Sequence, residues 1–172
     1  MRERKMMDVQ ATRLFDMLRD REVRVVFAES CTAGMVSATL AAVPGISDYL
    51  CGSMVTYRPE IKENWLGVEH ELLVEHSAES DAVTRRMAEA VLERAPAAQL
   101  AAAITGHLGP AAPDDLDGVV FIAVAMQQAD GRFVVESTRQ KLKSHERVER
   151  QREASSMVLS RLQKFLAGQA DS

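Results

Sequence analysis

The stretch VRVVFAESCTAG, residues 23–34, indicates the fold class of this 172-residue chain most clearly. Its first half is apolar and rich in β-branched side chains, which is typical of a buried strand. Its second half is a short polar turn, and small and apolar residues then continue until Pro44 and Gly45 end the segment. A strand, a tight polar turn and a helix in this order indicate an α/β protein.

The rest of the chain repeats this pattern on both sides of that stretch. Apolar residues at helical spacing predict helices over residues 7–18, 35–43, 80–94 and 145–166, with a short one that begins at Pro59. Strands are expected over residues 23–28, 49–57, 100–105, 118–127 and 132–141, with a hairpin turn at residues 129–131 and a loop over residues 106–117. Gly52 predicts either a bulge or a close backbone approach in the second strand.

These elements predict one α/β domain over residues 1–172, with a core from about residue 7 to residue 166. About five strands among four or five helices suit a three-layer α/β/α arrangement with a mixed sheet. The chain is long enough for one domain with a buried core and too short for two comfortable ones.

Composition excludes several classes of function. A net charge of -4 without a concentrated basic face argues against nucleic-acid binding. The two cysteines, Cys31 and Cys51, have no CxxC spacing, so neither a disulfide framework nor a zinc knuckle is expected. The charged first twenty residues are unlike a signal peptide, and no apolar run reaches the roughly 20 residues of a membrane span. We therefore expect a soluble, cytoplasmic protein with no membrane partner.

Polar residues follow three of the predicted strands, where open α/β sheets bind ligands. Ser30 comes directly after the first strand, at the start of a helix whose free N–H groups suit an oxyanion. By itself such a serine is more often an N-cap than a nucleophile. Tyr57 and Lys62 flank the next strand-to-helix junction, where a lysine is either solvated or, if desolvated beside a serine, a general base. Thr105 ends a third strand, where its hydroxyl can orient a substrate or cap a turn.

The other candidates are weaker. Cys31 neighbours Ser30, but no histidine arrangement points to it as a nucleophile. His70 and His76 have no metal-ligand companions at useful spacing and are interpreted as surface residues. His107 and His145 are single and ambiguous. The chain contains neither a GxGxxG motif nor a P-loop, so nothing in it indicates dinucleotide or triphosphate binding.

Several motifs together resemble those of one family. The run AESCTAG (residues 28–34) is similar to its AESCTGG motif, and VTYRPEIK (residues 55–62) is similar to its VTYxNxxK motif. Residues 66–68 match the LGV that follows in the family, and residues 105–106 match the start of its TGIAGPGG loop. Residues 118–123, GVVFIA, are similar to its GLVxxA strand. The chain thus resembles the CinA C-terminal domain family, whose enzymatic members are nicotinamide mononucleotide deamidases.

The resemblance implies an amidase that converts nicotinamide mononucleotide to nicotinate mononucleotide and ammonia. Ser30 would attack the amide carbon, Lys62 with help from Tyr57 would move the proton, and backbone N–H groups of residues 32–34 would bind the oxyanion. The resemblance implies no metal and no cofactor, a nucleotide as the small-molecule partner, and a homodimer or higher homo-oligomer. It also implies substrate-binding roles for seven residues: Glu29, Thr32, Ala33, Gly34, Thr105, Gly106 and Arg147.

The sequence departs from the family pattern mainly in one loop. Residues 105–112 are TGHLGPAA where the family has TGIAGPGG, so His107 and Leu108 add bulk and two glycines become alanine. Other changes are Ala33 for the first glycine of a pair, Ser77 for a glycine, and His145-Glu146-Arg147 for Gly-Asp-Arg. The departures leave open a same-fold amidase with another small amide as substrate, or a non-catalytic nucleotide-binding or regulatory homologue. A structural protein that acts through another surface is a third alternative.

Overall fold

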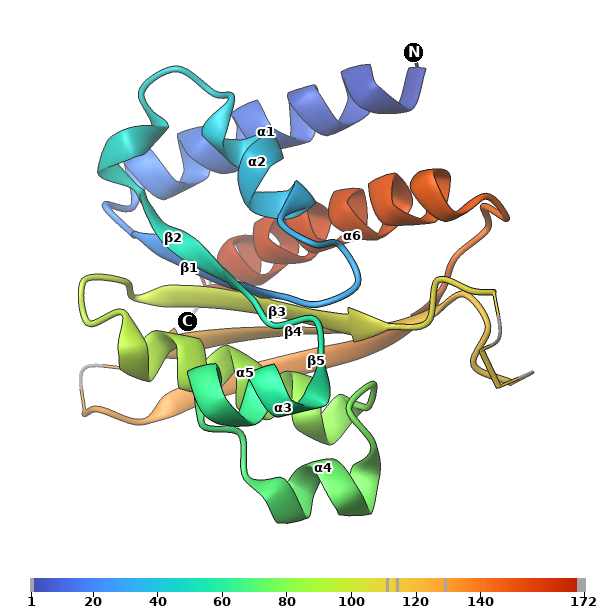
Figure 1. The fold of residues 1–172 in the computed structure, drawn as a ribbon. Helices are drawn as coiled ribbons and strands as arrows, with labels where there is room; N and C mark the ends of the chain where they lie inside the picture. Colours follow the sequence, from blue (N-terminus) through green and yellow to red (C-terminus); the bar gives the residue numbers. More distant parts are fainter. Residues whose placement is uncertain (1, 111, 114, 129, 170–172) are drawn as a thin grey trace.

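A mixed five-stranded sheet lies between two layers of helices in the computed structural model, which describes residues 2–110, 112–113, 115–128 and 130–169 (Figure 1). The strand order is β2-β1-β3-β4-β5. Strand β1 runs parallel to its neighbours β2 and β3, whereas β4 is antiparallel to both β3 and β5. The strands are β1 (Val25–Glu29), β2 (Leu50–Val55), β3 (Leu100–Gly106), β4 (Val119–Gln127) and β5 (Phe133–Lys141). This arrangement confirms the predicted fold class.

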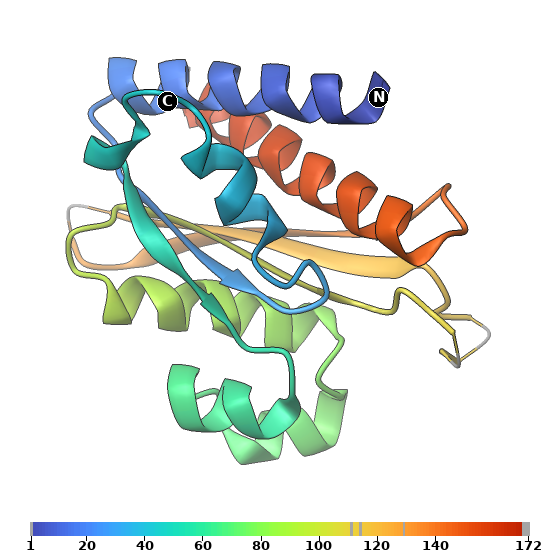
Figure 2. The ribbon, with the colours of Figure 1, turned by 45° about the horizontal axis from the view of Figure 1, so that its top comes forward.

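The helices cover both faces of the sheet. Figures 1 and 2 show α1 (Arg2–Asp20), α2 (Met35–Ala41) and α6 (Arg147–Gly168) on one face, and α3 (Pro59–Ile61), α4 (His70–His76) and α5 (Asp81–Arg94) on the other. Two short helices, η1 (Ile46–Asp48) and η2 (Lys62–Leu66), complete the set. The sequence did not predict α4, because this helix has only 7 residues and its apolar residues Leu72, Leu73 and Val74 are consecutive, so they show no helical spacing. Leu72 and Leu73 are partly buried against the core. No helix among the described residues has the length and apolarity to cross a membrane.

Strand β1 divides the core in two because its side chains alternate between the faces. Val25 and Phe27 pack with α1, α2 and α6, whereas Val26 and Ala28 pack with α5 and η2. All four are buried, which is the reason for the continuous apolar run in the sequence.

The pairing of β1 with β2 is irregular at its start. Val25 pairs with Leu50 but Val26 pairs with Gly52, so the register shifts between these two residues of β1. This irregularity is the bulge that Gly52 predicts. A Cβ atom added at Gly52 would meet no described atom within 4 Å, so close packing does not require a glycine there. The predicted turn residue Ala129 lies outside the described part of the chain.

The parallel strands bring three polar segments to one edge of the sheet. Ser30 follows β1, Tyr57 follows β2, and Gly106 is the last residue of β3. The carboxyl ends of neighbouring parallel strands share an edge, and ligands of open α/β sheets bind there. Arg147 begins α6 and reaches the same edge, since its side chain contacts Tyr57. The fold therefore positions a site at this place.

Candidate active site

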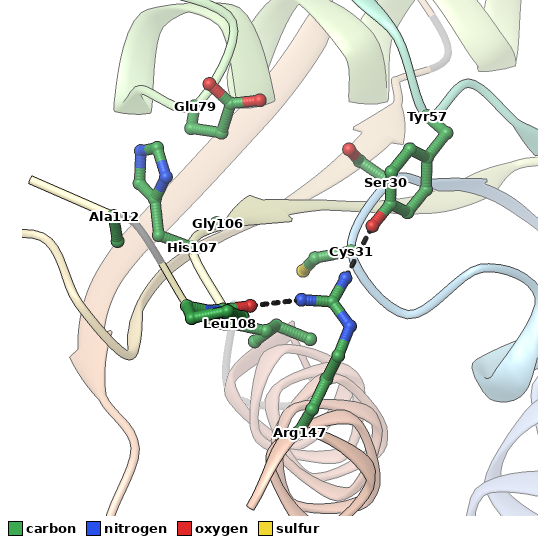
Figure 3. Close-up of a pocket in the computed structure, with 11 residues that line it drawn as sticks. Ser30, Cys31, Tyr57, Glu79, Gly106, His107, Leu108, Ala112 and Arg147 are labelled. Atoms are coloured by element: carbon green, nitrogen blue, oxygen red, sulfur yellow. Dashed lines mark hydrogen bonds between the residues drawn. The ribbon is translucent and has the colours of Figure 1, made fainter. Parts of the chain in front are cut away.

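A pocket of about 200 Å³ opens at this edge of the sheet (Figure 3). Figure 3 shows Ser30 and Tyr57 on one side of it, Glu79 and His107 on the opposite side, and Arg147 below. The lining residues are Ser30, Cys31, Tyr57, Glu79, residues 106–110, Ala112 and Arg147. The sheet edge thus carries a hydroxyl, a thiol and groups of both charges around one small space.

Lys62 lies against Ser30. The Lys62 Nζ atom is 3.1 Å from Ser30 Oγ, and it donates to the carbonyl oxygens of Thr56 at 2.9 Å and Tyr57 at 3.4 Å. The side chain enters from the short helix η2 and is 0% exposed, while Ser30 is 4% exposed. A buried lysine held by neutral oxygens, with its Nζ on a serine hydroxyl, is the arrangement of a Ser–Lys catalytic pair.

Burial changes the proton affinity of the Lys62 amine. Removal from water disfavours the ammonium form and lowers the pKa of Lys62 below its ordinary value of 10.5. The negative charge of Glu79 is the largest influence that opposes this shift. A lysine with a lowered pKa has a larger neutral fraction near neutral pH, which is the form that accepts a proton from a serine.

Cys31 is a poor alternative nucleophile. Its thiol is buried, and burial raises the pKa of Cys31 to about 12. Because the thiolate is the nucleophilic form, a thiol with this pKa is almost entirely unreactive near neutral pH. This agrees with the lower rank that the sequence assigns to Cys31.

Tyr57 contributes to the site differently from the expected proton transfer. The residue is 48% exposed, and its hydroxyl accepts a hydrogen bond of 2.6 Å from Arg147 Nη2. Its backbone carbonyl, rather than its hydroxyl, holds Lys62. Arg147 also donates to the carbonyl of Gly109, so its guanidinium bridges the end of β2 and the loop after β3. Arg147 is therefore placed to bind an anionic group at the pocket.

Glu29 does not line the pocket and acts as a cap for α2. Its buried carboxylate accepts five hydrogen bonds of 2.8–3.1 Å, from Thr32 Oγ1, Ser53 Oγ and the backbone N–H groups of Gly34, Val36 and Ser37. These N–H groups belong to the first turn of α2, where helix donors have no partner within the helix. Glu29 was predicted to bind the substrate, but it has a structural role, because both of its carboxylate oxygens already accept hydrogen bonds from the protein.

We expect Glu29→Gln to lower the free energy of unfolding by about 3 kcal/mol. The amide has one acceptor oxygen, and its NH2 group faces backbone donors in place of the second. Denaturant unfolding measures the change, with Glu75→Gln on the exposed face of α4 as the matched control. A variant as stable as its control would show that this hydrogen-bond set is not needed.

Residues 32–34, in the turn after Ser30, form hydrogen bonds within the protein. Thr32 is buried and bonded to Glu29, the Ala33 N–H donates to the Ser30 carbonyl, and the Gly34 N–H donates to Glu29. The N–H groups of Ala33 and Gly34 are consequently not free to bind an oxyanion, contrary to the expectation from the resemblance. Ala33 has a φ of 51°, a left-handed conformation that favours glycine, which explains why the similar family motif has glycine there.

The end of β3 places one predicted residue in the pocket and one away from it. Thr105 is 0% exposed, and its hydroxyl lies 2.7 Å from the hydroxyl of Thr84 on α5, so it does not reach the pocket. Gly106 does line the pocket. A Cβ atom at Gly106 would lie 2.5 Å from the carbonyl oxygen of Val119, so only glycine allows this approach of β3 to β4.

The loop after Gly106 is anchored to α6. Arg150, one turn after Arg147, forms two hydrogen bonds of 2.7 Å with the Asp117 carboxylate, which lowers the pKa of that carboxyl group. His107 and Leu108, two of the departures from the family motif, both line the pocket. Ala111, where the family motif has glycine, lies outside the described residues.

Glu79 also lines the pocket and was not predicted from the sequence. It lies in the connection between α4 and α5, just before the N-cap Ser80, and no motif marks it. The histidines His70 and His76 are exposed, as predicted. Among the described residues no group of three or more histidine, cysteine, aspartate or glutamate side chains is arranged for a metal ion.

Known proteins show the same domain. The model of the CinA C-terminal domain family matches residues 8–166. The chain belongs to this family. A CinA-like protein of Prochlorococcus marinus (strain MIT 9313) is 43% identical over 117 residues, and a CinA-like protein of Mycobacterium sp. (strain JLS) is 39% identical over 115 residues. Each match covers 67% of this chain.

Solved structures agree with the CinA assignment. The crystal structure of a CinA superfamily protein from Klebsiella pneumoniae 700603 has a TM-score of 0.86 at 30% identity, covering 94% of this chain and 98% of that one. A CinA superfamily protein from Escherichia coli has a TM-score of 0.83 at 25% identity, with coverages of 92% and 90%. The curated relatives are longer, because each match covers only 27% of their length.

Proposed function

We propose that this CinA-domain protein is an amidase that hydrolyses the carboxamide of nicotinamide mononucleotide to nicotinate mononucleotide and ammonia. The contact of 3.1 Å between Lys62 Nζ and Ser30 Oγ carries the proposal. The two groups come from different elements, η2 and the turn after β1, and meet at the wall of a pocket. Burial of the amine supplies the base that the Ser30 hydroxyl needs.

In the first half of the proposed reaction, Ser30 Oγ forms a bond to the amide carbon while the neutral Lys62 amine takes the hydroxyl proton. The tetrahedral intermediate collapses when its C–N bond breaks, and Lys62 returns the proton to the nitrogen, which leaves as ammonia. Water then attacks the acyl–Ser30 ester and loses a proton to Lys62. Cleavage of the ester releases the carboxylic acid, and Lys62 returns this proton to Ser30.

The oxyanion needs hydrogen-bond donors near Ser30. We assign this role to the backbone N–H groups of Cys31 and Thr32, because within the described residues they donate to no oxygen atom. The N–H of the residue after a nucleophile serves in this way in other hydrolases. Arg147, with Tyr57 beside it, is the group that binds the substrate phosphate.

The test of the proposed function is product analysis with nicotinamide mononucleotide. Purified protein is expected to release ammonia and nicotinate mononucleotide in equal amounts. Folded protein that releases neither would reject this substrate. A panel of other small carboxamides then separates an amidase of different specificity from a non-catalytic homologue, and a nucleotide that co-purifies with the protein would support the latter.

The lowered pKa of Lys62 determines how kcat/KM for amide hydrolysis depends on pH. The neutral amine is the active form, so kcat/KM is expected to rise with pH as Lys62 loses its proton, with a midpoint below 10.5. Initial rates across a series of buffers of equal ionic strength measure this limb. A profile that stays flat or falls over the same range would argue against Lys62 as the base.

One observation favours an alternative with the same chemistry. On the pocket wall, Leu108 is larger than the alanine of the similar family loop, and His107 places a polar imidazole where that loop has an apolar isoleucine. An amidase with these residues is suited to a different small amide if nicotinamide mononucleotide does not fit. The double variant His107→Ile with Leu108→Ala restores the family residues, and a gain in nicotinamide mononucleotide hydrolysis would identify this loop as the cause.

A further inference from the structure

One carboxylate of the pocket has no part in the reaction described above. Glu79 is half-buried in the loop between α4 and α5. Figure 3 shows it on the pocket side that faces Ser30 and Tyr57. Within the described part of the chain its carboxylate accepts no hydrogen bond and forms no ion pair. Since none of the described residues occupies its two oxygens, a molecule in the pocket can bind to them.

The position of Glu79 sets a requirement on that molecule. Glu79 lines the same pocket as Ser30 and Cys31, so a molecule in the pocket meets its carboxylate and the reacting hydroxyl together. Arg147 lies at another side of the same space of about 200 Å³. A ligand that fills the pocket must then bring an anionic group to Arg147 and hydrogen-bond donors to Glu79, because a desolvated carboxylate without donors is costly.

We propose that Glu79 accepts hydrogen bonds from the two neighbouring hydroxyls of a ribose in the substrate, and that the site thereby selects ribosyl amides. This inference rests on the proposed function. In nicotinamide mononucleotide the ribose joins the carboxamide ring to the phosphate, so it lies between the parts assigned to Ser30 and Arg147. A vicinal diol offers two donors to the two oxygens of one carboxylate, and acidic residues bind ribose hydroxyls in this way in dinucleotide-binding folds.

The experiment compares nicotinamide mononucleotide with its 2′,3′-dideoxy analogue, which keeps the amide, the ring charge and the phosphate. The measured quantity is the ratio of the two kcat/KM values. We expect wild-type protein to prefer the diol by about ten- to a hundredfold. Glu79→Leu should lose this preference, and Glu79→Gln should keep part of it because its amide oxygen still accepts one hydrogen bond. Any change that Glu79 variants cause in the proton affinity of Lys62 affects both compounds equally and cancels in the ratio.

Glu75→Leu on the exposed face of α4 is the matched control, and thermal unfolding verifies that each variant is folded. An unchanged ratio in folded Glu79→Leu would overturn the assignment of Glu79 while leaving the amidase proposal intact. If wild-type protein converts neither compound, the proposed function fails and this inference fails with it. The two failures are therefore distinguishable.

Discussion

Ser30→Ala is expected to lower kcat for amide hydrolysis by roughly 10⁴-fold or more, since removal of a covalent nucleophile leaves only binding and oxyanion stabilisation. Ser30 Oγ accepts a hydrogen bond from Lys62 Nζ. Among the described residues, the only other hydroxyl that lines the pocket is that of Tyr57, which accepts a hydrogen bond from Arg147. The measurement is ammonia release under substrate saturation by wild-type and variant proteins at equal concentration.

The matched control is Ser155→Ala. Ser155 is also buried, but its hydroxyl donates to the Gln151 carbonyl within α6, and it does not line the pocket. We expect this variant to keep wild-type activity. Substantial ammonia release by Ser30→Ala would assign the attack to water or to another residue and would remove the basis for a Ser–Lys pair.

Lys62→Met is expected to lower kcat/KM by roughly 10³-fold without loss of stability. Methionine has similar length and no charge, so it fills the space of the Lys62 side chain but accepts no proton. The folded state disfavours the charged lysine, which is the reason for its lowered pKa. The stability contribution of Lys62 is therefore fully present above pH 10.5 and is lost as the pH falls through its folded-state pKa. Methionine avoids this loss, although the Thr56 carbonyl loses a donor.

Thermal unfolding at neutral pH is expected to give a Tm for Lys62→Met equal to or above that of wild type. The control is Lys164→Met on the exposed face of α6, which should change neither activity nor Tm appreciably. A marked fall in Tm would identify Lys62 as a structural residue. Undiminished activity would exclude it as the base.

Much of the fold follows from local patterns in the sequence. All five strands form close to their predicted positions, because each one is an apolar or alternating run bounded by turn residues. The helix α4 was not predicted, since it has only 7 residues and its three apolar residues are consecutive, which leaves no helical period in the sequence. The predicted second strand is longer than β2, because the chain leaves the sheet after Val55 and turns towards η2. In this turn Tyr57 lines the pocket, and Lys62 follows it and contacts Ser30.

The meeting of Ser30 and Lys62 was predictable, since parallel strands bring their carboxyl ends to one edge and the motifs point to both residues. The roles of other residues depend on tertiary contacts that local patterns do not encode. Glu29 could not be recognised as a cap before its contacts with α2 and Ser53 were known. Thr105 bonds to Thr84 across the α5 interface, and Glu79 reaches the pocket from a separate loop.

The covalent step tests the central claim most directly. Wild-type, Ser30→Ala and Cys31→Ala proteins are mixed with nicotinamide mononucleotide, quenched in acid during the first turnover, and mapped by peptide mass. The proposal predicts an acyl group on Ser30 in the wild-type and Cys31→Ala proteins and no acyl group on Ser30→Ala. An acyl group on Cys31, or turnover by Ser30→Ala at the wild-type rate, would contradict it.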